Sequence, residues 1–336
     1  MNFRKFLYPF SILYDGVTSL RNYAYDKGWK ESTEFEVPVI CVGNLSVGGT
    51  GKSPMVELLV QFLKEDYKVA VLSRGYKRKS KGFLKVTESA TSEMVGDEPL
   101  QIKRKFPEIT VAVCANRREG IQKLQGKAEV ILLDDAFQHR KVKPAFSILL
   151  TAFDSLFIED YLLPAGNLRE SRRGAYRADI IVVTKCPDRV PYAKLQEIQF
   201  RMQLDPEQSI YFSRIGYDPF IYGKTEQLPL DYLKGKPFTL ITGIAKPQPL
   251  VNFLKGKKFE FQHKRFPDHH HFSDSEINTL QREELILTTE KDFQRLSHRI
   301  QKKAFYFLPI KTEILHEREG AFKKEVLNRL EYYRKF

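Results

Sequence analysis

The sequence predicts an α/β fold whose core is a mostly parallel, doubly wound sheet. Two observations carry this prediction. After residue 36, apolar runs rich in β-branched residues alternate with helix-like segments, and a glycine-rich stretch joins the first run to the first helix. Continuous apolar runs are typical of parallel strands that helices cover on both faces. The composition, 42% hydrophobic and 29% charged, is that of a globular chain.

The apolar runs and the helical patterns between them give the expected elements in order. In the first part of the chain we expect strands at 37–42, 68–72, 110–114, 130–133, 146–150 and 179–184, and helices at 52–64, 117–125 and 193–203. A smaller set follows, with strands at 238–241, 259–261, 285–287 and 304–308 and a helix at 249–254. Because strands alternate with helices in both sets, we expect two α/β domains.

The changes in pattern also place the boundaries. We expect a helix over residues 1–30, a core domain over 31–212, a linker over 213–232, a smaller domain over 233–316 and an exposed charged helix over 317–336. The linker is placed where the sequence becomes polar and carries Pro219, Gly223 and Pro229. A chain of 336 residues is long enough for two separate cores.

The expected N-terminal helix is amphipathic. Apolar residues recur at helical spacing from Phe3 to Leu20, and cations such as Arg4 and Arg21 lie among them. Such a helix can lie in a membrane interface, with its apolar stripe in the acyl boundary and its cations near anionic head groups. It can also dock on the core of its own domain, and the pattern leaves both alternatives open.

The net charge of +13 indicates an acidic partner, which could be nucleic acid, an anionic membrane surface or a phosphorylated substrate. No basic run with interleaved aromatics forms a recognised nucleic-acid module, so nucleic acid is not an expected partner. Cys41, Cys114 and Cys186 have no metal-binding spacing and are expected to be reduced core residues. The sequence shows no secretory signal and no segment of the about 20 apolar residues that a spanning helix needs.

The glycine-rich stretch SVGGTGKS is the strongest local signal for function. It comprises Ser46, Val47, Gly48, Gly49, Thr50, Gly51, Lys52 and Ser53. It follows an apolar strand and opens a helix, which is the context of a phosphate-binding loop. Backbone N–H groups can then surround a polyphosphate, while Lys52 reaches the β and γ phosphates and Ser53 holds Mg²⁺. Ser46 stands where the usual pattern has glycine, but three glycines remain.

Acidic residues at strand ends indicate a metal and a catalytic base. Asp134 and Asp135 end the 130–133 strand beside the loop, where a Mg²⁺-binding aspartate is expected. A kinase also needs a group that orients and deprotonates the acceptor hydroxyl. The candidates for it are Asp97, Glu98, His139, Asp268, His269, His270 and His271. No second ligand cluster accompanies the three histidines, so zinc is not expected.

Basic residues gather in the loops, and a guanidinium binds phosphate as a bidentate fork. These residues are Arg74, Lys77, Arg78, Arg117, Arg118, Arg169, Arg172 and Arg173. Each could be a solvated surface charge, but together they suit a substrate that carries its own phosphate. TKCPD, residues 184–188, resembles the guanine-reading motif [NT]KxD with Pro187 in place of the aspartate, which disfavours a GTPase.

Nine motifs in order resemble the tetraacyldisaccharide 4'-kinase family. They are VGNLSVGGTGKSP, LSRGYKRK, VGDEP, ANRREG, LLDDAFQHR, LLPAGNLRE, TGIAKP, FPDHHHF and LTTEKD, and they extend over about 250 residues. The resemblance implies a kinase that moves the γ-phosphate of ATP, with Mg²⁺, to the 4'-hydroxyl of tetraacyldisaccharide 1-phosphate in lipid A biosynthesis. It also implies a P-loop core, a smaller domain that closes over the nucleotide, and a peripheral position at the cytoplasmic face of the bacterial inner membrane through the N-terminal helix.

The resemblance further implies roles for individual residues. Asp97 would be the catalytic base, paired with His269, although His270 or His271 could be the imidazole that points inward. The other catalytic residues would be Asp134 and Arg169, and the metal residues would be Ser53, Asp135 and Glu98. The substrate residues would be Arg74, Asn116, Arg117, Arg118, Gln138, His139 and Glu170.

One alternative from another class is open at this point. A membrane-recruited P-loop ATPase that works as a positioning or assembly switch would also carry a basic amphipathic helix. Such switches often have a second lysine early in the phosphate loop, where this chain has Val47 and Gly48. The kinase is therefore the expected function, and a monomer the expected state.

Overall fold

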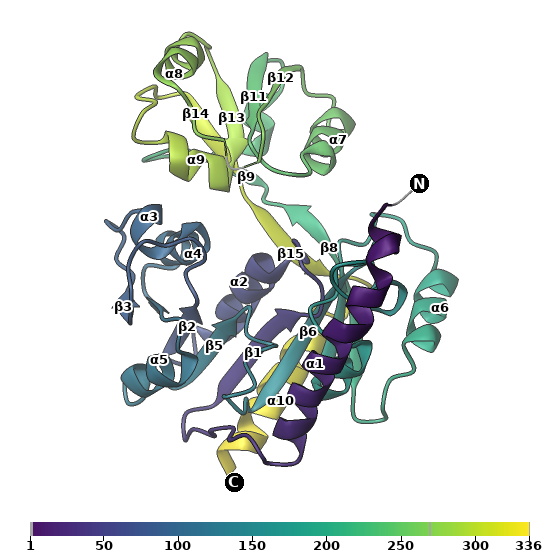
Figure 1. Ribbon diagram of the computed structural model, residues 1–336. Coiled ribbons are helices and arrows are strands. Elements are labelled where there is room, and N and C mark those ends of the chain that lie inside the picture. The colour runs from purple at the N-terminus through teal and green to yellow at the C-terminus, as the bar shows by residue number, and fades with distance from the viewer. Residues whose placement is uncertain (1–2, 269, 336) are drawn as a thin grey trace. The chain divides into compact units, whose positions relative to one another are not determined.

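The structure is a computed structural model and describes residues 3–268 and 270–335. The chain forms two compact units (Figure 1). Unit 1 combines Met1–Ile215 with Thr312–Phe336, and unit 2 is Gly216–Lys311. The chain therefore leaves unit 1, forms unit 2 and returns.

Unit 1 is built on a nine-stranded sheet in the order β15-β8-β7-β6-β1-β5-β2-β4-β3. The strands are β1 (Val39–Asn44), β2 (Val69–Ser73), β3 (Leu84–Lys85), β4 (Thr110–Val113), β5 (Val130–Asp134), β6 (Phe146–Ala152), β7 (Ile180–Thr184), β8 (Ser209–Tyr217) and β15 (Ile310–Ile314). The seven strands from β8 to β4 in this order pair in parallel. The prediction of a mostly parallel sheet is confirmed.

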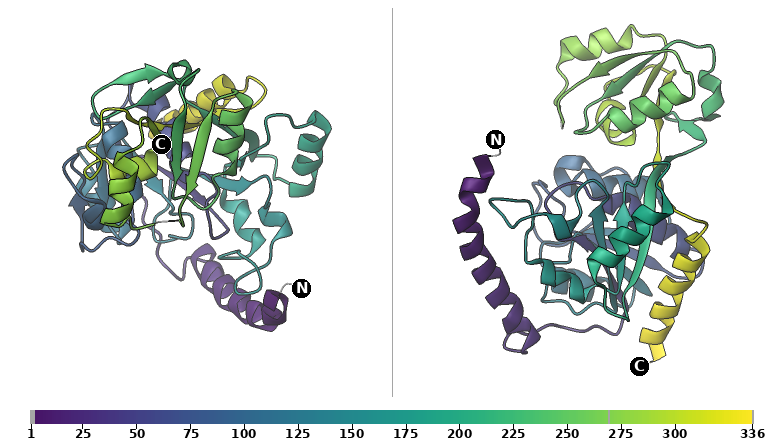
Figure 2. Two further views of the ribbon diagram at one scale, coloured as in Figure 1. Left: turned by 90° about the horizontal axis from the view of Figure 1, so that it is seen from above. Right: turned by 90° about the vertical axis from the view of Figure 1, so that its right-hand side faces the viewer.

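Helices cover both faces of this sheet, and its strands are therefore buried on both sides. Alternate residues of β1 enter different cores: Ile40 and Val42 one, Val39 and Cys41 the other. The first core takes residues of α2 (Lys52–Leu63), α4 (Asp97–Lys105) and α10 (Glu319–Lys335), and the second takes residues of α5 (Arg117–Leu124) and α6 (Tyr192–Met202). Figure 2 shows α1 and α10 on opposite sides of the sheet of unit 1. This is the doubly wound arrangement.

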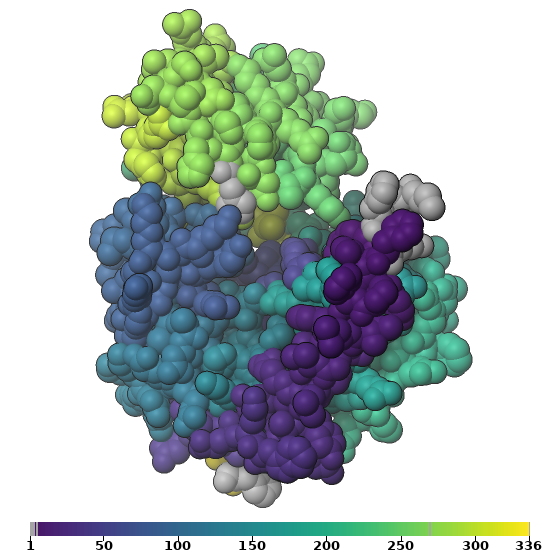
Figure 3. All heavy atoms as spheres, viewed as in Figure 1, coloured from purple at the N-terminus to yellow at the C-terminus, as the bar shows by residue number. Residues whose placement is uncertain are grey.

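The N-terminal helix α1 (Tyr8–Asp26), which follows the 3-10 turn Phe3–Leu7, turns its polar side to unit 1. Ser11 is its only buried residue and donates to the carbonyl of Leu162 at 2.9 Å. The apolar stripe points outward: Phe10, Leu13 and Val17 are 62%, 69% and 63% exposed. Figure 3 shows this helix as a ridge along the surface of unit 1. No helix among the described residues is both long enough and apolar enough to span a bilayer.

Unit 2 is a smaller α/β unit with its own six-stranded sheet, in the order β10-β9-β14-β13-β11-β12. Its elements are β9 (Phe220–Tyr222), β10 (Gln227–Pro229), β11 (Phe238–Thr242), α7 (Gln248–Gly256), β12 (Phe261–Arg265), α8 (Asp274–Gln281), β13 (Ile286–Thr289), α9 (Glu290–Leu296) and β14 (Phe305–Leu308). Helix α7 packs in one core, and α8 and α9 pack in another. Four of the strands pair in parallel.

The structure differs from the expected boundaries in three places. Residues 312–316 were expected in the smaller domain, but they belong to unit 1. Residues 213–232 are not a separate linker, because they contribute to β8, β9 and β10, and Ile221 is fully buried in the core of unit 2. The C-terminal helix is not simply an exposed charged helix, because Phe322, Val326 and Leu330 are fully buried in unit 1. The last two segments are about as rich in apolar residues as the whole chain, but polar and charged residues are interleaved with them, so their sequence does not show which residues are buried.

Candidate active site

The phosphate-loop stretch connects β1 to α2, as the sequence predicts. The loop closes at Gly51, the residue before α2, which has φ +86°, and Gly48 has φ +113°. These left-handed angles suit glycine, since a side chain would be strained there. Asn44, fully buried at the end of β1, donates to Thr50 Oγ1 at 2.8 Å and holds the loop from inside. The helix N-terminus and its backbone N–H groups form an anion-binding cradle.

A second segment pairs with the phosphate loop and positions Arg169. Val47 N–H donates to the carbonyl of Asn167 at 2.7 Å, and Arg169 N–H donates to that of Leu45 at 2.7 Å. The guanidinium of Arg169 then reaches Asn44 Oδ1 at 2.8 Å and Asp135 Oδ1 at 3.1 Å. The motifs VGNLSVGGTGKSP and LLPAGNLRE therefore meet as neighbouring extended segments.

Lys52 and the two carboxylates at the end of β5 lie at one end of the phosphate loop. Lys52 Nζ is 3.5 Å from Asp135 Oδ1, so Asp135 has both Lys52 and Arg169 as cationic partners. Asp135 itself has φ +48°, an uncommon angle for a residue with a side chain. Backbone strain of this kind gathers at functional sites.

Asp134 is a buried carboxylate of which only one oxygen has a hydrogen-bond partner. Its Oδ2 accepts from Ser73 Oγ at 3.1 Å, whereas its buried Oδ1 has no hydrogen-bond partner. Burial, followed by the charges of Glu98 and Asp135, raises the pKa of Asp134 to about 7. A divalent cation would relieve this excess of negative charge, and carboxylate oxygens are the ligands that Mg²⁺ prefers. Asp134 and Asp135 can therefore offer carboxylate oxygens to a magnesium ion, although among the described residues no group of three His, Cys, Asp or Glu is arranged to hold a metal by itself.

Asp97 and Glu98 open helix α4, directly after Gly96, whose φ is +93°. Both side chains are half-buried, and the effect of Glu98 on the pKa of Asp134 places it in the same electrostatic environment. A carboxylate in the first turn of a helix is stabilised by the positive end of the helix dipole. The sequence did not predict α4, but it did single out both acidic residues.

The predicted substrate residues fall into two groups. Arg74 and Asn116 are exposed at the carboxyl ends of β2 and β4, and Arg118 lies 3.6 Å from Glu31. Arg117, by contrast, is 3% exposed and donates to the carbonyls of Cys114 and Asp134 at 2.6 and 3.3 Å. Its fork is turned into the protein, so this placement does not support the expected direct grip on a substrate phosphate.

His139 is half-buried among cations. Burial, with the charges of Arg117, Lys141 and others, lowers the pKa of His139 to about 4. Its Nε2 is buried and has no hydrogen-bond partner. The imidazole is therefore neutral near pH 7 and can accept a hydrogen bond.

Gln138 and Glu170 join the site to the N-terminal helix. Gln138 Nε2 donates to the carbonyl of Asn44 at 2.8 Å and to Glu170 Oε1 at 3.0 Å. Buried Glu170 also accepts from Arg177 at 2.9 Å and from Asn22 of α1 at 2.7 Å. The sequence-based prediction missed Asn22, Arg177 and Asn44. Asn44 alone had a signal, since it lies two residues before the phosphate loop.

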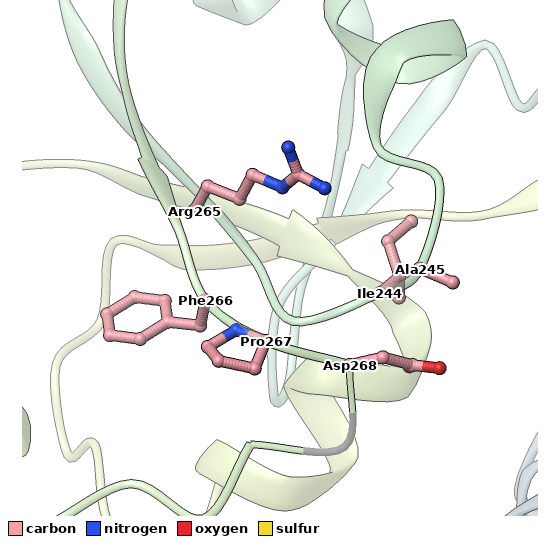
Figure 4. Close-up of a pocket in the computed structure, with 6 residues that line it drawn as sticks. All are labelled: Ile244, Ala245, Arg265, Phe266, Pro267 and Asp268. Atoms are coloured by element: carbon pink, nitrogen blue, oxygen red, sulfur yellow. The ribbon is translucent and has the colours of Figure 1, made fainter. Parts of the chain in front are cut away.

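Three motifs of unit 2 meet within that unit. Buried Asp292 of LTTEKD accepts from Gly243 N–H of TGIAKP at 2.8 Å. Ile244 and Ala245 share with Arg265 and Asp268 the wall of a cavity of about 450 Å³, shown in Figure 4. The TGIAKP motif and the start of FPDHHHF are thereby brought together.

The three histidines have different surroundings. His270 bonds to Glu276 at 3.0 Å and stacks on Phe266, so its ring is engaged within unit 2. His271 is exposed, and His269 lies outside the described residues.

Comparisons with known proteins agree with these observations. A family model described as tetraacyldisaccharide-1-P 4'-kinase matches residues 3–331. The chain is 49% identical to a tetraacyldisaccharide 4'-kinase of Flavobacterium johnsoniae over 94% of each chain, and 44% identical to that of Bacteroides thetaiotaomicron over 96% of this chain and 92% of the relative. It also resembles a crystal structure from Aquifex aeolicus, described as the "apo" form of LpxK in complex with ATP. The TM-score is 0.79 and the identity 33%, and the match covers 98% of this chain and 99% of the other.

Proposed function

Because the chain belongs to the tetraacyldisaccharide 1-phosphate 4'-kinase family, we propose that it transfers the γ-phosphate of ATP to the 4'-hydroxyl of this lipid during lipid A biosynthesis. The observation that carries the mechanism is the phosphate loop with Lys52 beside Asp135 and Asp134. A loop of this kind binds the triphosphate through backbone N–H groups and its lysine. The switch alternative loses its support, since full-length relatives carry the kinase name.

The transfer itself needs charge neutralisation at the terminal phosphate. Lys52 and Arg169 supply positive charge at the end of the loop where both contact Asp135. Mg²⁺ would be held by Ser53, Asp135 and Glu98, with Asp134 behind them, and would neutralise phosphate oxygens. The unpartnered Oδ1 of Asp134 supports this assignment.

Asp97 is the proposed base that accepts the proton of the 4'-hydroxyl. Its position in the first turn of α4, next to Glu98, puts a half-buried carboxylate at the edge of the sheet that carries Asp134. The proposal that His269 is the partner of Asp97 rests on the family resemblance alone. Arg74, Asn116 and Arg118 are the proposed contacts to the phosphorylated disaccharide, with Gln138, His139 and Glu170 closer to the phosphate loop.

The outward apolar face of α1 is the proposed membrane contact. Helix α1 is attached to unit 1 through polar contacts, such as Tyr14 Oη to the carbonyl of Arg169 at 2.9 Å, and leaves its large apolar side chains exposed. An interfacial helix needs this arrangement, since burial of the stripe in the acyl boundary supplies most of the binding. A peripheral enzyme at the cytoplasmic face of the inner membrane, working as a monomer, is the corresponding location and state.

The experiment is transfer of labelled γ-phosphate from Mg-ATP to tetraacyldisaccharide 1-phosphate in mixed micelles. We expect wild type to make the bisphosphorylated lipid, and Asp97→Asn to lose about 10²- to 10⁴-fold in kcat while it still binds ATP, because a general base contributes a factor of this size. Lys52→Ala should lose both transfer and ATP affinity. Asp66→Asn, an exposed carboxylate outside the site, is the matched control.

Each outcome has a defined meaning. Full transfer by Asp97→Asn would remove Asp97 from the role of base and leave the kinase intact. ATP hydrolysis by wild type without any lipid product would contradict the kinase and favour an ATPase switch.

A further inference from the structure

Glu57 is a buried acidic residue that the proposed transfer does not use. It lies in the middle of α2 and is 3% exposed. Both of its carboxylate oxygens bind side chains of α4: Oε2 accepts from Lys105 Nζ at 2.5 Å, and Oε1 accepts from Gln101 Nε2 at 3.1 Å. A buried carboxylate is costly unless it is paired and hydrogen-bonded. We call Glu57, Gln101 and Lys105 together the Glu57 clamp.

The clamp specifies one arrangement of α4 against α2. Gln101 and Lys105 are four residues apart, so they lie one turn apart on the same face of α4. The two helices also share an apolar core, which includes Leu59 and Ile102, but apolar contacts are not directional. If α4 slid by one turn or rotated, Glu57 would lose one or both of its partners. The clamp therefore opposes these movements.

The same face of α4 leads to Asp97. Asp97, Gln101 and Lys105 recur at intervals of four residues, so the proposed base lies toward the side of the helix that meets α2. At a rise of about 1.5 Å per residue, Lys105 lies about 12 Å from Asp97 along α4, and Glu57 lies about 8 Å from Lys52 along α2. The clamp thus connects the helix that begins with the phosphate-loop lysine to the helix that begins with the base.

The start of α4 is held by a close contact between two glycines. Gly96 has φ +93°, and a Cβ on it would lie 3.3 Å from Gly75 Cα and 3.3 Å from the carbonyl oxygen of Tyr76. Gly75 has φ +70°, and a Cβ on it would lie 2.9 Å from the carbonyl oxygen of Val95. Glycine permits this approach of two backbones. One contact at the start of a helix leaves its axis free to swing, whereas a second contact two turns later fixes the axis.

We propose that Glu57 is a positioning residue for the transfer: through Gln101 and Lys105 it fixes the axis of α4 and holds Asp97 in place beside the phosphate loop. The inference rests on the proposed kinase function, in which Asp97 accepts the proton of the acceptor hydroxyl. Such a base must lie within hydrogen-bond reach of that hydroxyl. A displacement of about 1 Å can lower a rate by about 10²-fold, so a contact two turns away is close enough to affect catalysis.

The first test separates the rate of transfer from the binding of ATP. We measure kcat for lipid phosphorylation, and the dissociation constant and stoichiometry of ATP by calorimetry, on the full chain. We expect Glu57→Ala to lower kcat by about 10- to 100-fold, and Glu57→Asp, whose carboxylate is one methylene shorter, to lower it by about 3- to 10-fold. The affinity for ATP should change by less than about twofold, with the stoichiometry of wild type, because the phosphate loop keeps its own contacts.

Glu108→Gln is the matched control. Glu108 accepts from Lys64 at 2.7 Å and joins the segment after α4 to the end of α2, but its side chain is 47% exposed. An exposed pair of this kind contributes little to the position of a helix. Its loss should change kcat by less than about twofold.

The second test asks whether Glu57 acts through Asp97. Glu57→Ala is combined with Asp97→Asn, and the residual transfer is measured over long incubations. Two residues that act as a unit are not additive, so Glu57→Ala should lower the rate of Asp97→Asn by less than about twofold. A merely structural residue would lower the rate by the same factor in both backgrounds.

Three results would overturn the positioning role: an unchanged kcat in Glu57→Ala, the same loss of rate with and without Asp97, or a loss of ATP-binding sites in proportion to kcat. Thermal unfolding checks that each variant is folded, and Glu57→Asp takes the place of Glu57→Ala if the latter is not. Failure of the kinase proposal is distinguishable, since wild type would then bind ATP without phosphorylating the lipid.

Discussion

The two carboxylates at the end of β5, Asp134 and Asp135, are adjacent in sequence but have different partners. Asp135 is paired with Lys52 and Arg169, whereas buried Asp134 has Ser73 and an unpartnered oxygen. The sequence identifies both as acidic residues at a strand end. It does not assign their partners, because Ser73 and Arg169 come from distant segments that only the sheet brings together.

The lowered pKa of His139 predicts a loss of stability in acid. The unfolded chain binds a proton at His139 near the ordinary pKa of about 6.5, whereas the folded protein does so only near 4. Above pH 6.5 the stabilising effect is complete. As the pH falls toward 4, the unfolded state takes up the proton first, so the free energy of unfolding decreases.

Denaturant unfolding at pH 7.5 and 5.0 measures this effect. We expect His139→Asn to lose less stability between the two pH values than wild type does. His316→Asn, an exposed histidine of the same unit, should behave like wild type. Equal losses in His139→Asn and wild type would show that His139 titrates normally in the folded protein.

At the scale of elements, the orientation of helix α1 has the clearest consequence for function. The periodicity predicted an amphipathic helix but left open whether the stripe faces the protein or a membrane. In the structure the polar residues Ser11, Tyr14 and Asn22 form hydrogen bonds with the rest of unit 1, and the apolar side chains face away from it. The choice depends on partners in residues 162–170, which the helix sequence does not contain.

We predict that the apolar stripe of α1 binds lipid vesicles. The double variant Leu13→Glu with Val17→Glu should bind vesicles with phosphatidylglycerol at least about tenfold more weakly, because each lost aliphatic side chain removes about 1.5 to 3 kcal/mol of burial. The measurement is flotation with these vesicles. Ser19→Glu, which adds a charge at an exposed position of the same helix, is the control.

A comparable loss in Ser19→Glu would attribute the effect to charge alone. Undiminished flotation of the double variant would exclude α1 as the main contact.

At the scale of the whole molecule, unit 1 is completed by both ends of the chain. Helix α10 returns after unit 2 and inserts Phe322 into the core, where its ring lies 4.9 Å from Tyr211 and 6.0 Å from Phe62. The sequence of this helix predicts a charged surface helix, because charged residues separate its apolar positions Phe322, Val326 and Leu330. The narrow apolar stripe of α10 is sufficient to pack the helix on unit 1, because the sheet presents a complementary apolar face.

Phe322→Ala should therefore destabilise unit 1. A fully buried phenylalanine replaced by alanine costs about 3–5 kcal/mol, through lost transfer energy and the cavity that remains. Tyr332→Ala, on the same helix but 68% exposed, should change stability by less than about 0.5 kcal/mol. Chemical denaturation followed by a probe in unit 1 measures both, and similar stabilities of the two variants would contradict the packing of α10.

The sequence by itself determined the fold class, the phosphate loop, the carboxylates beside it and the family. These features are local, because apolar periodicity, a glycine-rich stretch and short motifs can each be recognised from residues that are close together in the sequence. The tertiary structure decided which side chains meet: Arg169 with Asn44 and Asp135, Asn22 with Glu170, Lys185 with Gly49, and Arg117 with backbone carbonyls instead of solvent. These contacts join residues 34 to 148 positions apart, except for that of Arg117, and they depend on the order of strands in the sheet, which no local pattern specifies.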